Sequence, residues 1–211
     1  MNDDTIDPSQ ELFSALSLPV LKEVVYSGDK ADSLCSLLER SSCPLVQLTL
    51  TDSAGRTPTD TISLCRAAPS LESLCLPNVF PVGYFLPFLA ETAISTEDHE
   101  QSILPRLRTL YVSGKCNFSW DIIPNLFPFP LESDQRFLRP LETVKFEVSG
   151  WYYDQMSEES PAKVDVLLDA GTDISVVRAG EDLIQTMRQF YADPRPGEVW
   201  EEYSNDDIEE D

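Results

Sequence analysis

Pro69-Ser70-Leu71-Glu72-Ser73-Leu74-Cys75-Leu76 is the stretch from which the fold can be read. Leu74 and Leu76 alternate with Ser73 and Cys75, and this period of two is typical of a strand that buries one face. The same pattern of a proline followed by spaced apolar residues recurs, beginning at Pro19, Pro44, Pro105 and Pro140. A chain that repeats one strand in this way is expected to stack its copies side by side.

Helices are predicted between these strands. Residues 30–41 carry Leu34, Leu37 and Leu38 on one apolar stripe. Thr57 followed by Pro58 is typical of an N-cap with proline at the first helical position. Further helices are expected at residues 9–16, 161–170 and 181–191, and a short one within 116–138.

The segment from Val82 to Ala93 is the most apolar helix candidate, and Pro87 is expected to break or kink it unless the helix starts later and Pro87 lies in its first turn. Turns or loops are predicted at Ser113-Gly114 and at Gly150-Trp151-Tyr152-Tyr153, where the fourth and fifth strand copies should end.

The repeat has a measurable period. Its leading leucines are Leu21, Leu45, Leu71, Leu107 and Leu141, at steps of 24, 26, 36 and 34 residues. The first two steps and the Leu-x-x-Leu-x-Leu core match leucine-rich repeats, and the longer steps contain insertions. We therefore predict an α/β fold: a leucine-rich-repeat-like, right-handed solenoid with one curved parallel sheet and helices on its convex side.

This solenoid of about six irregular repeats is predicted to span residues 9–192. Residues 1–8 are expected to be a disordered N-terminus. Residues 193–211 are expected to be an acidic, disordered tail, because Glu198 to Asp211 contains many carboxylates and no basic residue.

The composition excludes several classes of partner. The formal net charge of -22 argues against binding to nucleic acid or to an anionic membrane surface. The five cysteines form no Cys-x-x-Cys pair and mostly have apolar neighbours, as reduced thiols do. With no signal-peptide core and no apolar run long enough to span a bilayer, a cytoplasmic or nuclear location is expected.

Four short segments resemble the leucine-rich-repeat region of fungal F-box proteins. They are Arg40-Ser41-Ser42-Cys43-Pro44-Leu45, Ala68-Pro69-Ser70-Leu71, Leu104-Pro105-Arg106-Leu107 and Leu167-Leu168-Asp169-Ala170-Gly171-Thr172-Asp173-Ile174. The resemblance implies the substrate-recognition part of an F-box-type ubiquitin-ligase receptor. The F-box itself is absent from this sequence, so a ligase adaptor is an expected partner only if an F-box is supplied upstream of Met1.

The sequence predicts no catalytic residue, no metal site and no cofactor. His99 is the single histidine, and it lies in the polar stretch Glu97-Asp98-His99-Glu100 without a second nitrogen or sulfur ligand nearby. No nucleophile elbow, P-loop or dinucleotide-binding glycine motif is present. A hydrolase that uses His99 is the remote alternative.

The candidate site is the concave face of the predicted sheet. Its side chains alternate with the buried leucines and are mostly small and polar. The predicted partner-binding residues are Glu23, Val25, Gln47, Thr49, Ser73, Cys75, Thr109, Tyr111, Thr143 and Lys145. Tyr111 is the expected anchor, because tyrosine is enriched among interface hot spots.

Trp151, Tyr152 and Tyr153 form a second candidate, either an aromatic anchor or a cover for the end of the solenoid. Together these patterns favour a non-catalytic, monomeric domain that binds a protein partner. The alternative is a scaffold or decoy that holds a partner without any link to ubiquitin.

Overall fold

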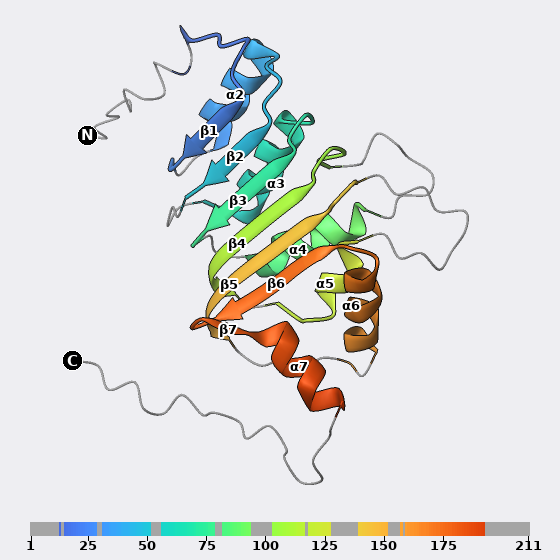
Figure 1. The fold of residues 1–211 in the computed structure, drawn as a ribbon. Helices are drawn as coiled ribbons and strands as arrows, with labels where there is room; N and C mark the ends of the chain where they lie inside the picture. The colour runs from blue at the N-terminus through green and yellow to red at the C-terminus, as the bar shows by residue number, and fades with distance from the viewer. Residues whose placement is uncertain are drawn as a thin grey trace, which may run out of the picture.

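One sheet organises the molecule. The computed structural model describes residues 13, 15–28, 31–51, 56–78, 82–93, 103–116, 118–127, 139–151, 157 and 159–192. Within these ranges seven strands form a single sheet in the order of the sequence (Figure 1). The strands are β1 (Glu23–Tyr26), β2 (Gln47–Leu50), β3 (Ser73–Pro77), β4 (Thr109–Cys116), β5 (Thr143–Trp151), β6 (Asp173–Arg178) and β7 (Glu181–Asp182).

The first six strands are parallel, and β7 pairs with β6 in the antiparallel direction. Helices α2 to α6 gather along one side of this sheet (Figure 1), and each helix from α2 onward contacts the next one in the chain. The helices are α2 (Ala31–Ser41), α3 (Pro58–Ala67), α4 (Val82–Glu91), α5 (Ile122–Asn125), α6 (Ser160–Asp169) and α7 (Leu183–Ala192). The predicted α/β architecture with a parallel sheet is therefore confirmed.

The core lies between the sheet and the helices, and strand register aligns it. Leu74 of β3 pairs with Leu48 of β2 and with Leu110 of β4, and all three side chains are fully buried. The ladder continues through Val144 of β5 to Ile174 of β6. Each strand thus adds its apolar side chains to rows that cross the whole sheet, which explains why the period of two recurs in the sequence.

The prolines that open the repeats lie just before the strands. Leu71 N donates to Ala68 O at 3.1 Å, and Leu107 N donates to Leu104 O at the same distance. These turns direct the leading leucine inward, so that Leu71 and Leu107 are fully buried. The first residues of the stretch Pro69–Leu76 therefore build a turn, and its last residues build the strand.

Two helix ends are closed by capping motifs formed by residues close together in the sequence. Thr57 and Asp60 form a reciprocal capping box at the start of α3: Asp60 N donates to Thr57 Oγ1 at 3.2 Å, and Thr57 N donates to Asp60 Oδ2 at 2.8 Å. At the end of α6, Gly171 N donates to Leu168 O and Thr172 N donates to Leu167 O. With a φ of 90° at Gly171, this pair of bonds is the Schellman motif.

A break at Pro87, one of the predicted effects of this residue, is wrong, because α4 continues as one helix across it. Proline removes one helical hydrogen bond, the one that Gly83 O would otherwise accept. Phe85, Leu86 and Leu89 on the same helix are all buried. We infer that burial of this apolar face outweighs the missing bond.

The predicted strand ends at Ser113-Gly114 and Gly150-Trp151 are also wrong. Strand β4 continues to Cys116 and β5 continues to Trp151, and these two residues pair with each other. The register shifts between Gly114 and Cys116, as it does at a β-bulge. Glycine at this position marked an irregular strand rather than its end.

Strand β7 was not predicted. Ala179 and Gly180 connect it to β6, and both have positive φ, 52° and 87°. Positive φ at both central residues is the requirement of a type I′ hairpin turn, whose usual sequence is Asn-Gly. Ala-Gly lacks that signal. Asp182, the last residue of the hairpin, accepts from Ile184 N at 3.0 Å and thereby caps α7.

A buried arginine joins the two ends of an insertion. Arg139 is 2% exposed, and its guanidinium donates to Leu89 O at 2.8 Å and to Ile103 O at 2.6 Å. Burial lowers the pKa of Arg139 to about 10, so the group stays charged at neutral pH. It therefore fixes the chain on both sides of residues 94–102, with its charge near the C-terminal end of α4.

Several expectations fall on residues outside the described ranges, namely the disordered N-terminus at 1–8, the polar stretch with His99 and the acidic tail at 193–211. Within the described part of the chain, no helix has the length and apolar character that crossing a bilayer requires.

Replacement of Leu74 tests the core assignment. Leu74→Ala is expected to lower the free energy of unfolding by roughly 2–5 kcal/mol, because it opens a cavity in a fully buried row. The neighbouring change Ser73→Ala, on the other face of β3, should stay within about 0.5 kcal/mol. Urea unfolding followed by circular dichroism measures both. Equal losses would contradict the assignment of Leu74 to the core.

Candidate functional site

The sheet has a second face, opposite the helices, which we call the open face. It carries the side chains that alternate with the core residues on β1 to β6, and the described residues place no helix over it (Figure 1). Register sets these side chains in rows across the strands. The first row is Glu23, Gln47, Ser73, Thr109, Thr143 and Asp173. The second row is Val25, Thr49, Cys75, Tyr111, Lys145 and Ser175.

All ten strand residues predicted from the sequence lie in these two rows. They are Glu23, Val25, Gln47, Thr49, Ser73, Cys75, Thr109, Tyr111, Thr143 and Lys145, and each is exposed or half-buried. A third, shorter row continues toward the carboxyl ends of the strands with Pro77, Ser113, Glu147 and Val177. The register therefore places residues from different repeats side by side, as Tyr111 and Lys145 are, 34 positions apart in the chain.

The aromatic candidates are distributed differently. Trp151 is the last residue of β5, where its backbone pairs with Cys116. Tyr152 and Tyr153 lie outside the described residues, so their predicted role as an aromatic anchor stays a prediction.

Charge on the open face is concentrated over β5 and β6. The middle strands contribute hydroxyls, one amide and one thiol, whereas Lys145, Glu147 and Asp173 lie together on β5 and β6. Lys145 Nζ is 3.4 Å from Asp173 Oδ2, across to the neighbouring strand. The open face thus has a neutral centre, a charged side over β5 and β6, and the Glu23 carboxylate at its β1 edge.

Tyr111 and Glu147 are joined by a hydrogen bond. The phenol Oη donates to Glu147 Oε2 at 2.7 Å, diagonally across the β4–β5 ladder. This bond raises the pKa of Tyr111, and partial desolvation contributes in the same direction. Tyr111 therefore stays neutral throughout the physiological pH range. Its hydroxyl donates a hydrogen bond that holds one oxygen of the Glu147 carboxylate in place.

Cys75 lacks the environment of a catalytic nucleophile. Desolvation raises the pKa of its thiol above the ordinary 9.0, against a smaller opposing contribution from the Thr49 hydroxyl. A thiol in this state is protonated at neutral pH, and a reactive cysteine needs the opposite shift. The single histidine, His99, lies outside the described residues, and within them no group of three or more metal-ligating side chains is found.

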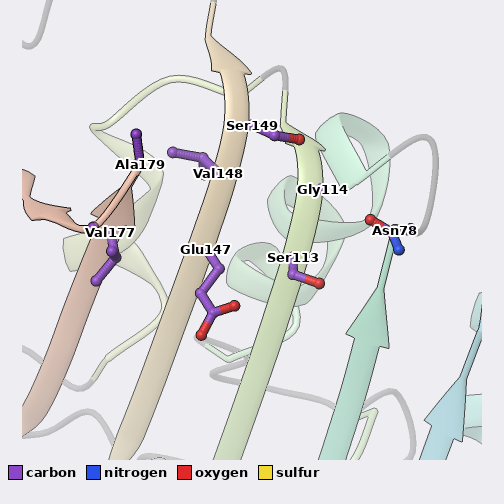
Figure 2. A pocket seen from close by; sticks show the side chains of 9 residues that line it. Asn78, Ser113, Gly114, Glu147, Val148, Ser149, Val177 and Ala179 are labelled. Carbon is purple, nitrogen blue, oxygen red and sulfur yellow. The ribbon is translucent and has the colours of Figure 1, made fainter.

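A shallow pocket of about 470 Å³ opens at the carboxyl ends of β3 to β6. Figure 2 shows Glu147 and Ser113 on adjacent strands, with Asn78 on one side and Val177 and Ala179 on the other. Parallel sheets commonly use this end of their strands to bind ligands. The pocket is an extension of the open face, since Ser113, Glu147 and Val177 form its third row.

Backbone geometry shapes the pocket. Asn78, which follows β3, has a φ of 54°, and its N–H donates to Ser113 O at 2.7 Å. Gly114 has a φ of 112°, and a Cβ built on it would lie 2.8 Å from Asn78 Cα. Only glycine allows the two strand ends to approach this closely. The sequence pattern predicted a turn at Ser113-Gly114, and nothing in it indicated that Asn78 or the turn at Ala179 would line a pocket.

Comparisons with family models, with curated proteins and with solved structures return no match to this chain. The function is therefore argued from the geometry of the open face.

Gly114→Ala tests the close approach that shapes the pocket. We expect the free energy of unfolding to fall by roughly 2–4 kcal/mol, because the new methyl group meets backbone and the φ is unfavourable. Gly171→Ala is the matched control: its φ of 90° is also positive, but a Cβ there meets nothing within 4 Å. Gly171→Ala should lower the free energy of unfolding by about 1 kcal/mol. Chemical denaturation compares the two, and a smaller loss for Gly114→Ala would contradict the contact.

Glu147→Gln is expected to lower the pKa of Tyr111 toward its ordinary value of 10.0, because the amide is a weaker acceptor for the phenol proton. The corresponding stabilisation is complete below the unfolded pKa and is lost as the pH rises through the raised, folded value. Carbon NMR of ring-labelled tyrosine follows the titration. Glu23→Gln, on the same face but distant from Tyr111, should leave it unchanged. An unaltered titration in Glu147→Gln would disprove the bond.

Proposed function

We propose that the open face binds another protein and that the chain acts without catalysis, as a leucine-rich-repeat-like recognition domain. The strand order and the one-sided arrangement of the helices support this proposal. Parallel strands that follow one another in sequence, with their helices on one side, leave the other side of the sheet free along its whole width.

The observation that carries the proposal is the continuity of the first two rows. Adjacent strands lie about 4.8 Å apart, so six strands present a surface about 24 Å wide. An extended peptide of about seven residues covers the same distance. The side chains in the centre are neutral, which keeps the cost of removing water from them low. Tyr111 supplies a large aromatic surface near the charged side, as interface anchors do.

The resemblance to the repeat region of fungal F-box proteins specifies which kind of protein we propose the open face to bind. By that resemblance, the bound protein is the substrate of a ubiquitin ligase, and a ligase adaptor takes part only if an F-box is supplied upstream. In the scaffold or decoy alternative, the same face holds its partner and no adaptor takes part.

A pair of arginine substitutions tests the open face. Thr109→Arg introduces a long cation in the first row, whereas Gln185→Arg introduces it on the exposed side of α7. Affinity capture from cells that express the natural gene product, compared by quantitative mass spectrometry, should recover a set of proteins with the parent chain and with Gln185→Arg. Thr109→Arg should reduce their recovery about tenfold or more, as loss of a central contact does.

The identity of the captured proteins separates the alternatives. A ligase adaptor and its cullin together with a partner that Thr109→Arg loses would support the ligase function. A partner lost in Thr109→Arg without any adaptor would support the scaffold. Equal recovery with Thr109→Arg and Gln185→Arg would overturn the assignment of binding to the open face.

A further inference from the structure

The pocket at the carboxyl end of the open face has a specific chemistry. Glu147 is its one charged lining residue, and the polar side chains around it are those of Asn78, Ser113 and Ser149. Val177 and Ala179 form an apolar wall (Figure 2). A carboxylate next to neutral hydrogen-bonding groups and a short apolar wall complements a cation on an alkyl stem.

Glu147 is available to such a cation. Its side chain is exposed and, across the described ranges, it takes part in no ion pair. The Tyr111 hydroxyl donates to Oε2, and a carboxylate has acceptor capacity for further donors at both oxygens. The carboxylate is therefore held in position by a neutral donor, and its negative charge is not compensated by that contact.

The nearest lysine on the same strand does not supply this compensation. Lys145 lies two residues before Glu147 on β5, and its ammonium is 3.4 Å from Asp173 Oδ2 on β6. Neither Lys145 nor the exposed Lys115 of β4 lines the pocket. Arg178 belongs to the opposite face, because it alternates with Val177 along β6 and pairs with Val148.

From this arrangement we propose that the pocket receives an arginine side chain of the bound protein, with its guanidinium on Glu147 and its stem along Val177 and Ala179. Arginine suits the site better than lysine because its planar fork of donors reaches a carboxylate and flanking hydroxyls together. The inference rests on the proposed protein-binding function and adds the chemistry of the partner. The net charge of -22 favours the approach of a basic segment in the same sense.

The test uses a pair of short peptides as probes, acetyl-Gly-Ser-Arg-Ser-Gly-amide and the same peptide with citrulline in place of arginine. Citrulline keeps the shape of arginine and removes its charge. Amide chemical shifts of the labelled protein are followed during titration with each peptide. We expect the arginine peptide to shift residues around Ser113, Glu147 and Ala179 and to bind about fivefold tighter than the citrulline peptide.

Three variants locate the interaction. Glu147→Gln should reduce the affinity for the arginine peptide about fivefold, to that of the citrulline peptide, while the protein spectrum shows an intact fold. Glu23→Gln removes the same charge at the other side of the open face and should leave the affinity unchanged. Tyr111→Phe frees the carboxylate from its donor and should weaken binding about twofold.

Equal affinities for the two peptides would overturn the proposal, and so would equal losses in Glu147→Gln and Glu23→Gln, which would indicate a response to net charge alone. The peptide titrations are independent of the capture experiment that tests the proposed function. If Thr109→Arg loses its captured proteins but the arginine peptide does not bind, protein binding by the open face stands and the arginine site is disproved.

Discussion

The parallel register of the six strands is the constraint on which the rest of the structure depends. It aligns Leu48, Leu74 and Leu110 into a buried row, and their contact with the helices supplies the apolar burial that stabilises the fold. Because side chains alternate along each strand, the same register lays out the open face without any further interaction. A slip of one residue would exchange the two faces of a strand, so core packing also protects the arrangement of the polar rows.

Charged groups have different environments on the two sides of the sheet. On the helix side, Arg139 is buried among carbonyl oxygens and serves the connection between segments of the chain. On the open side, charges remain in contact with water and gather over β5 and β6, where they lie beside a hollow rather than beneath a helix. The first arrangement is stabilising because Arg139 gives the buried Ile103 carbonyl a donor and adds a second donor to Leu89 O, which also accepts from Thr92 Oγ1. The second leaves charge available to a ligand, and it contributes little to stability because water screens it.

The elements that the sequence predicted well are those that local chemistry decides. The strand periodicity around Leu74, the N-cap at Thr57 and the helix expected at residues 161–170 each depend on residues within a few positions of one another. The alternation also identified ten residues of the open face, because a period of two assigns faces before any contact is known. The errors arise where distant residues decide: burial of α4 overrides Pro87, and Asn78 meets Gly114 only after β3 and β4 pair. The pocket could not be predicted for the same reason, since three of its sides come from separate strands that meet only in the folded sheet.

Strand order that follows the sequence has a consequence for the tolerance of the chain to insertions. Every new strand pairs with the preceding one, so each pairing closes only the loop between two consecutive repeats. Closing a loop of 36 residues, as between Leu71 and Leu107, instead of 26, as between Leu45 and Leu71, costs only about 0.3 kcal/mol of chain entropy. Extra residues in the connection between a helix and the next strand therefore add length to individual repeats without disturbing the ladder. Variation in those segments is nearly neutral for folding, and they are the part of this architecture in which new surface can accumulate most easily.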